Sequence, residues 1–248
     1  MTGVLTDVDD TLTRDGAIEP VALAALQALH AADVPVLAVT GRPLGWSEPF
    51  ARDWPVRAIV AENGAVAVYR DGDGGLRTEY VQDEATRAHN ALRLHAAAAR
   101  VLREVPGATL ARDSAGRVTD IAVDHSEFAQ LSPAQVARAV AVMRDEGMNA
   151  TVSSIHVNGW YGSHDKPGGA RWIVQRLLGR ELDAERERWL YVGDSTNDQA
   201  MFGCIPLSVG VANLLHFEAQ LHTWPAYLTQ GERGAGFAEV ARSLLAAR

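Results

Sequence analysis

Three carboxylates stand within four positions of one another just after the first apolar stretch of the chain. The sequence there reads VLTDVDDT, so that Asp7, Asp9 and Asp10 follow a short hydrophobic segment. Aspartates at the end of a strand often only make turns, since their side chains accept hydrogen bonds from nearby backbone N–H groups. Alone, this pattern favours a turn. With suitable partners elsewhere in the chain, the same residues could supply a nucleophile and a proton donor.

Two further polar groups follow or precede apolar segments. Thr40, Gly41 and Arg42 come directly after VPVLAV, and Lys166 comes at the start of a helical pattern, KPGGARWIVQRLLG. Each has an ordinary structural interpretation as well. The Thr-Gly-Arg sequence suits a strand-to-helix turn, and a single lysine is most often a solvated surface residue.

The most specific group is GDSTND, which follows the apolar segment RWLYV. It contains Asp194 and Asp198 without a neighbouring residue that balances their charge. No single group is decisive. Their joint occurrence, in this order and at the ends of apolar segments, favours a functional site.

Outside the middle of the chain, apolar segments alternate with helical patterns, which is typical of parallel β/α units. Ligands of such sheets bind beyond the carboxyl ends of the strands, so Asp7, Asp9, Thr40 and Asp194 should meet there. Two bare carboxylates about 4 Å apart repel by about 4 kcal/mol at an effective dielectric constant of about 20, so a cation is required. Ligands that are all oxygen favour Mg²⁺ over Ca²⁺ in an open site, and zinc would need His or Cys.

The stretch 78–161 interrupts this alternation. It reads as helix, strand, strand, helix, strand, strand, which predicts two helices over one antiparallel sheet. We therefore expect an α/β fold, with a Rossmann-like parallel-sheet core of residues 1–77 and 162–248 and an inserted α+β domain of residues 78–161. A polar, glycine-rich stretch, 69–77, precedes the insertion and predicts a hairpin or hinge.

Composition excludes several classes of protein. The chain has 248 residues, 47% of them hydrophobic, and a formal net charge of −8, which leaves no general basic surface for nucleic acid. The single cysteine, Cys204, rules out an internal disulfide framework and fits a reducing compartment. No apolar run is long enough for a membrane span, and the N-terminus is acidic where a signal peptide would be basic. We expect a cytoplasmic protein.

Taken together, the polar groups resemble the four motifs of the haloacid dehalogenase superfamily of phosphohydrolases. DVDDT matches Asp-x-Asp-x-Thr, and the Thr40 group, Lys166 and GDSTND match the other three in order. The αββαββ insertion and the sequence AENGA are similar to the class IIB (Cof-like) subfamily, which includes sugar-phosphate phosphatases. Two positions depart from the pattern. Asp10 and Pro167 stand where glycine is frequent, and we expect Asp10 to be tolerated because its side chain need not enter the site.

The resemblance implies a Mg²⁺-dependent phosphomonoesterase with an inserted cap that excludes water. It implies that Asp7 attacks phosphorus to give an aspartyl-phosphate, and that Asp9 protonates the leaving alcohol and then activates water. The implied metal ligands are Asp7, the backbone carbonyl of Asp9 and Asp194, with Asp198 ranked below them. The implied phosphate-binding residues are Thr40, Gly41 and Lys166.

The substrate is expected to be a small phosphorylated metabolite, with a sugar phosphate favoured. Candidate substrate-binding residues are Arg42, Asn63, His156 and Asn158. Trp46, Trp160 and Tyr161 lie in the same segments, and packing explains them at least as well.

Two other functions remain open at this point. A phosphomutase or phosphotransferase would pass the phosphoryl group to a sugar hydroxyl, and a non-catalytic metabolite-binding protein would keep only the fold. The complete acidic and lysine set argues against the second of these. A halide-releasing dehalogenase is less favoured because it would not need Asp9 and Asp194 to hold a metal. The sequence leaves the assembly open between a monomer and a small homo-oligomer.

Overall fold

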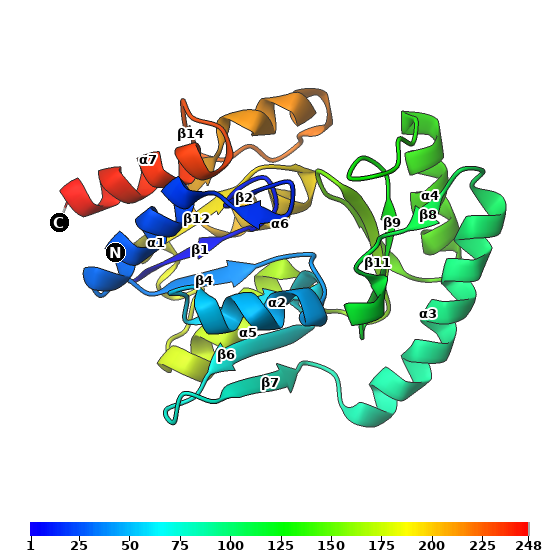
Figure 1. Ribbon diagram of the computed structural model, residues 1–248, viewed down its shortest axis with the longest axis horizontal. Coiled ribbons are helices and arrows are strands. Elements are labelled where there is room, and N and C mark those ends of the chain that lie inside the picture. Colours follow the sequence, from blue (N-terminus) through cyan, green and yellow to red (C-terminus); the bar gives the residue numbers. More distant parts are fainter. Residues whose placement is uncertain (248) are drawn as a thin grey trace.

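The computed structural model describes residues 1–247, and it contains a large and a small β-sheet that lie side by side, each covered by helices (Figure 1). The large sheet has the strand order β14-β13-β12-β1-β4-β5-β6-β7. Pairing is parallel from β14 to β5 and antiparallel from β5 to β7. The predicted α/β class is confirmed. The strands of this sheet are β1 (Gly3–Thr6), β4 (Val36–Val39), β5 (Ala58–Ala61), β6 (Val66–Arg70), β7 (Leu76–Tyr80), β12 (Trp189–Gly193), β13 (Leu207–Gly210) and β14 (Tyr227–Leu228).

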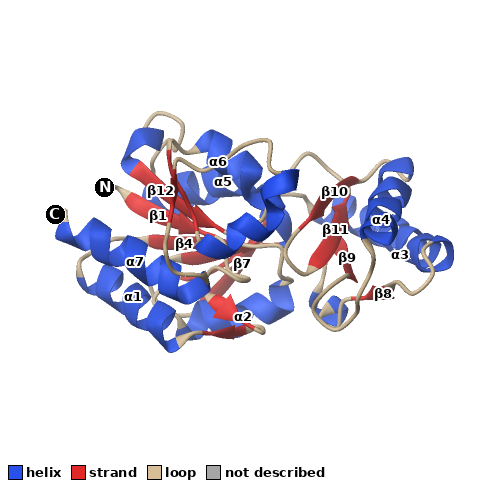
Figure 2. Ribbon diagram, turned by 90° about the horizontal axis from the view of Figure 1, so that it is seen from above, coloured by secondary structure: helices blue, strands red, loops and turns tan. Residues whose placement is uncertain are grey.

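Helices cover both faces of the large sheet, which explains why its central strands are almost uniformly apolar. The helices α1 (Pro20–Ala31), α2 (Leu44–Asp53) and α7 (Arg233–Ala246) pack on one face. The helices α5 (Lys166–Leu178) and α6 (Gln199–Cys204) pack on the other, as Figure 2 shows. A short hairpin of β2 (Thr13–Arg14) and β3 (Ala17–Ile18) follows β1. Single turns of 3₁₀ helix include η1 (Glu62–Gly64), η3 (Arg186–Arg188) and η4 (Thr196–Asp198), and η5 (Ala212–Gln220) is longer.

The small sheet and two long helices form what we call the inserted layer, residues 81–161. Its antiparallel strands have the order β10-β11-β9-β8, and its helices α3 and α4 cover the side of the sheet that faces away from the large sheet (Figure 2). Both helices begin at the caps that the sequence offers: Asp83 accepts from the Thr86 N–H, and Ser132 makes a capping box with Gln135. The elements are α3 (Glu84–Glu104), β8 (Thr109–Leu110), η2 (Ser114–Gly116), β9 (Asp120–Asp124), α4 (Pro133–Asp145), β10 (Asn149–Val152) and β11 (His156–Trp160).

The glycine-rich stretch before the insertion is a tight hairpin turn within the large sheet. The Asp71 carboxylate accepts hydrogen bonds from the N–H groups of Asp73 and Gly75, which closes the turn between β6 and β7. The expected boundary at 77/78 therefore falls inside β7. The chain leaves the large sheet after Tyr80 and returns to it just before α5.

No helix within residues 1–247 is long and apolar enough to cross a membrane.

Candidate active site

The carboxyl ends of β1, β4 and β12 meet at one edge of the large sheet, and this edge faces the inserted layer. The Asp7 N–H donates to the Val192 carbonyl at 2.8 Å, which ties the residue after β1 to β12. Asp194 follows β12 directly. Neighbouring parallel strands thus bring together side chains that are far apart in the sequence.

Lys166, the first residue of α5, lies among these carboxylates. Its Nζ is 2.7 Å from Asp7 Oδ1 and 2.7 Å from Asp198 Oδ1, and all three side chains are buried. Asp7, Asp194 and Asp198 offer carboxylate oxygens that lie within 4.8 Å of one another. Three carboxylates and one ammonium group leave two negative charges unbalanced. One divalent cation would balance them.

The two aspartates of GDSTND are in different situations. Asp198 is fully engaged: its Oδ2 accepts from the N–H groups of Asp194 and Ser195, and its Oδ1 accepts from Lys166 and from the Tyr191 hydroxyl. Asp194 has an Oδ1 that is buried and has no hydrogen-bond partner within residues 1–247. A buried carboxylate oxygen needs a partner. The donor set therefore fits a hard divalent cation held by Asp7 and Asp194, with Asp198 holding the loop.

Burial raises the pKa of Asp7, and the ammonium group of Lys166 acts in the opposite direction. Burial also raises the pKa of Asp194, and the charges of Asp198 and Asp7 add to this effect. Both shifts have the sign expected of a site in which anionic groups are crowded without enough positive charge.

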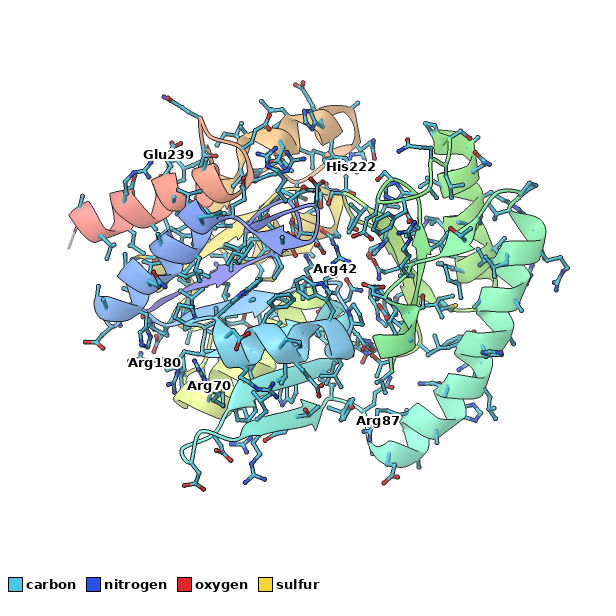
Figure 3. All side chains as sticks on the ribbon, in the orientation of Figure 1. Arg42, Arg70, Arg87, Arg180, His222 and Glu239 are labelled. Atoms are coloured by element: carbon cyan, nitrogen blue, oxygen red, sulfur yellow. The ribbon has the colours of Figure 1, made fainter. Side chains whose placement is uncertain are left out.

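Asp9 points to a different cation from Asp7. Both of its carboxylate oxygens are 2.9 Å from Nε of Arg42, whose side chain is 4% exposed. Arg42 also bonds the inserted layer, with Nη1 at 3.2 Å from Asp113 and Nη2 at 2.8 Å from Glu127. Figure 3 shows Arg42 between the large sheet and the inserted layer. The residue expected to bind substrate is therefore occupied by three carboxylates.

Thr40 and Gly41 lie at the end of β4. The Thr40 hydroxyl is buried and accepts from the Arg42 N–H at 3.0 Å. The Gly41 carbonyl accepts from Arg117 and from Asn158, both of the inserted layer. A Cβ on Gly41 would be 3.3 Å from Asn63 Oδ1, so the close approach favours glycine there.

The other expected substrate-binding residues lie at the boundary between the two sheets, and each already has a protein partner. Asn63 and Asn158 both donate to Asp120 Oδ2, at 3.4 and 3.2 Å. His156 Nε2 is 3.0 Å from Glu127 Oε2. Burial raises the pKa of Glu127, but His156 and Arg42 outweigh it and hold that pKa at about 2.

Packing explains the aromatic residues that the sequence left open. Trp46 packs on Phe50, and its ring lies 5.1 Å from the Arg42 guanidinium carbon. Trp160 and Tyr161 are buried, and the Trp160 indole donates to the His164 carbonyl.

We expected Asp10 to be tolerated because its side chain need not enter the site, but that side chain lies beside the site. Its side chain lines the cavity next to the site and pairs with Arg233 at 2.7 Å. Asn213 completes this contact, because it donates to the Asp10 carbonyl and to Asp194 Oδ2 and accepts from the Arg233 N–H. Asp10 has φ of 51°, the left-handed conformation for which glycine is favoured. The departure from glycine thus brings a charged pair into the site.

A cavity of about 450 Å³ opens between the carboxyl edge of the large sheet and the inserted layer. Asp9 and Asp194 reach it from the sheet side, and Glu127 and Phe128 reach it from the inserted layer. The cavity is large enough for a phosphorylated sugar. Its remaining lining residues are Asp10, Thr13, Asp15, Gly16, Arg42, Ser126, Ser154, Ile155, Asn213, His216, Phe217 and Arg233.

Sequence reasoning missed several polar residues that join the two sheets. Glu62 is fully buried and accepts from the backbone N–H groups of Leu44, Val118 and Thr119 and from the Thr119 hydroxyl. Arg117 bonds Asp113 and Asp120 as well as Gly41. The one available signal was the density of charge in RDSAGRVTD, which reads equally well as a solvated hairpin.

Residues 4–104 match the family of haloacid dehalogenase-like hydrolases. No curated protein matches the chain significantly in sequence. The fold, in contrast, has many similar solved structures. Thermoplasma acidophilum protein 0175 has 17% identity and a TM-score of 0.71, with 98% of this chain and 97% of that chain covered.

Two other similar structures are described as phosphatases. The sucrose-phosphatase of Synechocystis sp. PCC6803, solved with sucrose and phosphate, has 16% identity and a TM-score of 0.67, covering 97% of this chain and 96% of that one. The HAD subclass IIB sugar phosphatase BT4131 has 14% identity and a TM-score of 0.62, covering 98% and 99%.

These findings confirm the resemblance to the haloacid dehalogenase superfamily by sequence over residues 4–104, and the solved structures share the fold over almost the whole chain. The fold, with its inserted layer, is similar to that of the protein described as a HAD subclass IIB sugar phosphatase.

Proposed function

We propose that the protein is a Mg²⁺-dependent phosphatase that hydrolyses a small phosphomonoester through an aspartyl-phosphate on Asp7. The observation that carries the proposal is the buried group of Asp7, Lys166 and Asp194, in which one carboxylate oxygen of Asp194 has no hydrogen-bond partner among the described residues 1–247. Asp9 stands two residues from Asp7 and lines the same cavity as Asp194. The proposed acid/base and one residue of the proposed cation site thus line one cavity, and the proposed nucleophile stands two residues from that acid/base.

The first half of the reaction transfers the phosphoryl group to the protein. An Asp7 oxygen attacks phosphorus, the bond to the ester oxygen breaks, and Asp9 gives its proton to the leaving alcohol. In the second half, Asp9 takes a proton from water, whose oxygen attacks phosphorus and releases Asp7 and inorganic phosphate. Lys166 and Thr40 are proposed to bind the phosphoryl oxygens, where negative charge is spread in the transition state.

Asp7, Asp194 and the Asp9 backbone carbonyl are proposed to hold the metal ion. A bound Mg²⁺ supplies the positive charge that lets an anionic nucleophile approach an anionic phosphate.

For the substrate, we propose a sugar phosphate or a related polyol phosphate. The cavity is about 450 Å³ in volume and combines hydroxyl groups of Thr13, Ser126 and Ser154 with the aromatic ring of Phe128. Such a mixture suits a ligand with many hydroxyl groups. The inserted layer is proposed to act as the cap that covers this ligand, and the fold shared with a phosphatase solved with sucrose and phosphate supports this.

The test is the hydrolysis of p-nitrophenyl phosphate by wild type, Asp7→Asn and Asp183→Asn. Asp183 is an exposed aspartate paired with Arg171, so it controls for the change of residue type. We expect Asp7→Asn to lose at least about 10³-fold in kcat, because the nucleophile is gone, and Asp183→Asn to keep its rate. Chelation of divalent metal should abolish activity and Mg²⁺ should restore it. Turnover by Asp7→Asn would remove Asp7 as nucleophile, and full activity after exhaustive chelation would remove the metal.

A further inference from the structure

The guanidinium group of Arg42 is shared between the proposed acid/base and the inserted layer. Nε faces Asp9, while Nη1 and Nη2 face Asp113 and Glu127. Asp9 and Arg42 belong to the loops after β1 and β4, and the other two carboxylates belong to the loops before and after β9. Two of the three anchors of Arg42 are therefore in the inserted layer.

Those two anchors are themselves held within the inserted layer. Asp113 Oδ1 is 3.2 Å from Arg117 Nη2, and Glu127 Oε2 is 3.0 Å from His156 Nε2. On the sheet side, the ring of Trp46 lies 5.1 Å from the guanidinium carbon of Arg42. The direction in which Nε points is thus set mainly by the position of the inserted layer.

Asp9 has no other hydrogen-bond partner for its carboxylate within residues 1–247. A carboxylate that must give a proton to one oxygen atom and later take one from water needs a fixed direction, because proton transfer requires hydrogen-bond distance. If the inserted layer moved away, Arg42 would keep Asp9 and the ring of Trp46 but lose two of its three carboxylate partners, and with them most of its constraint. Asp9 would then lose its orientation.

We propose that Arg42 is a positioning residue that couples closure of the inserted layer to the placement of Asp9. Asp113 and Glu127 fix the guanidinium group only when the layer is closed, so that the acid/base is in place only when the site is covered. Lys166 and Asp7 do not depend on this coupling, because their partners all lie at the large sheet. This inference rests on the proposed phosphatase activity.

The leaving group gives a readout that a purely structural role would not change. Phenyl phosphate and p-nitrophenyl phosphate have similar shapes, but nitrophenolate is stabilised and leaves without a proton, whereas phenolate is more basic and needs one. Misplacing the acid should therefore slow phenyl phosphate more than p-nitrophenyl phosphate. The quantity to measure is the leaving-group ratio, defined as kcat/KM for p-nitrophenyl phosphate divided by kcat/KM for phenyl phosphate, with Mg²⁺ present.

The variants are Glu127→Gln, which removes the charge of one anchor of Arg42 without changing Arg42 or Asp9, and Arg42→Lys, which keeps the positive charge but loses the planar guanidinium group. Glu146→Gln is the matched control, because Glu146 pairs with Arg100 elsewhere in the inserted layer. Asp9→Asn is the positive control. We expect the ratio to rise about 10²-fold or more in Asp9→Asn and about 10-fold in Glu127→Gln and Arg42→Lys, and to stay unchanged in Glu146→Gln. Circular dichroism confirms folding, and Glu127→Gln carries the test if Arg42→Lys does not fold.

Equal losses on both substrates, or no loss on either, in Glu127→Gln would overturn the coupling. A ratio unchanged even in Asp9→Asn would remove Asp9 as the acid, and the coupling with it. Absence of any phosphatase activity in the wild type would instead refute the proposed function itself. The outcomes are therefore distinguishable.

Discussion

Lys166 and Arg42 are both buried cations surrounded by carboxylates, but different parts of the molecule supply those carboxylates. Lys166 contacts Asp7 and Asp198, both from the loops of the large sheet. Arg42 contacts Asp9 from the large sheet and two carboxylates from the inserted layer. Asp7 and Asp9, two positions apart in the sequence, are thus paired with different cations. Lys166 has all its partners at the edge of the large sheet, whereas Arg42 has partners on both sides of the boundary.

The difference teaches that the two proposed chemical roles have different structural requirements. The ion-pair partners of the proposed nucleophile lie at the large sheet, so we expect its placement not to depend on closure of the inserted layer. The proposed acid/base is bound to Arg42, whose two other carboxylate partners lie in the inserted layer. Each of the following predictions tests one side of this contrast.

The largest effect is expected at Lys166. Lys166→Met removes the only ammonium group from three buried carboxylates and one of the proposed phosphoryl-binding groups, so kcat/KM for p-nitrophenyl phosphate should fall by about 10³-fold or more. The ratio of kcat/KM for p-nitrophenyl phosphate to that for phenyl phosphate should not change, because Asp9 is not disturbed. A loss below tenfold would show that the internal cluster is not essential.

A pH-dependent loss of stability is expected at His164, in the segment that returns from the inserted layer to Lys166. Burial lowers the pKa of His164 to about 4 from an ordinary value of 6.5, and neither ring nitrogen has a hydrogen-bond partner within residues 1–247. The unfolded chain therefore binds more protons than the folded one between these values. Stability should fall as pH drops through this window, by up to about 3 kcal/mol, and the effect should be absent above it.

Urea unfolding at pH 7 and pH 4.5 measures this difference. His164→Phe keeps an aromatic ring stacked beside Trp160 and should lose less stability than wild type on acidification. His222→Phe, at an exposed position, serves as the control. An identical loss of stability in His164→Phe and wild type would show that the segment around His164 is open to water.

A smaller effect is expected at Glu62, which crosses the same boundary as Arg42 but touches no proposed catalytic group. Glu62→Gln replaces one acceptor oxygen with a donor among four donor groups, and should lower the free energy of unfolding by about 2 kcal/mol. The ratio of kcat/KM for p-nitrophenyl phosphate to that for phenyl phosphate should rise less in Glu62→Gln than in Glu127→Gln. A ratio change as large as in Glu127→Gln would show that closure in general, and not Arg42, places Asp9.

The smallest effect is expected where Gly45 of α2 and Gly116 of η2 pack backbone against backbone. A Cβ on Gly116 would lie 3.1 Å from the Gly45 Cα, so Gly116→Ala forces α2 and η2 slightly apart. We expect a loss of about 1 kcal/mol, read as a lower Tm. Gly72→Ala is the matched control, because a Cβ there meets nothing within 4 Å. An unchanged Tm in Gly116→Ala would show that the closed spacing is easily adjusted.

The fold class and the internal cluster were accessible from the sequence because both depend on local patterns and one topological rule. Asp7 and Asp194 follow apolar strands, and parallel strands present their carboxyl ends at one edge. The αββαββ order of the insertion was also legible, since its helices carry clear caps. The structure brings Asp7, Lys166, Asp194 and Asp198 into contact, as those patterns suggested.

The boundary cluster was not accessible in the same way. Asp113 and Glu127 lie in loops of the inserted layer, and nothing local distinguishes them from solvated surface acids. Their significance arises only when two separately folded sheets face one another and Arg42 is buried between them. For the same reason, Arg42 was assigned to substrate. The contacts of Asp10 with Arg233 and Asn213 were hidden for another reason, since those residues lie about 200 positions later in the sequence.

The contact between Asp10 and Arg233 has a consequence for how the chain acquires its final form. The two residues are 223 positions apart, and Asn213 locks both of them to Asp194. The turn after the first strand therefore gains these contacts only after residues 213–233 have been synthesised and folded back against it. During translation, the motif that contains Asp7 and Asp10 is made long before Asn213 and Arg233. A ribosome-bound intermediate should therefore contain the proposed nucleophile before these two residues have packed beside it.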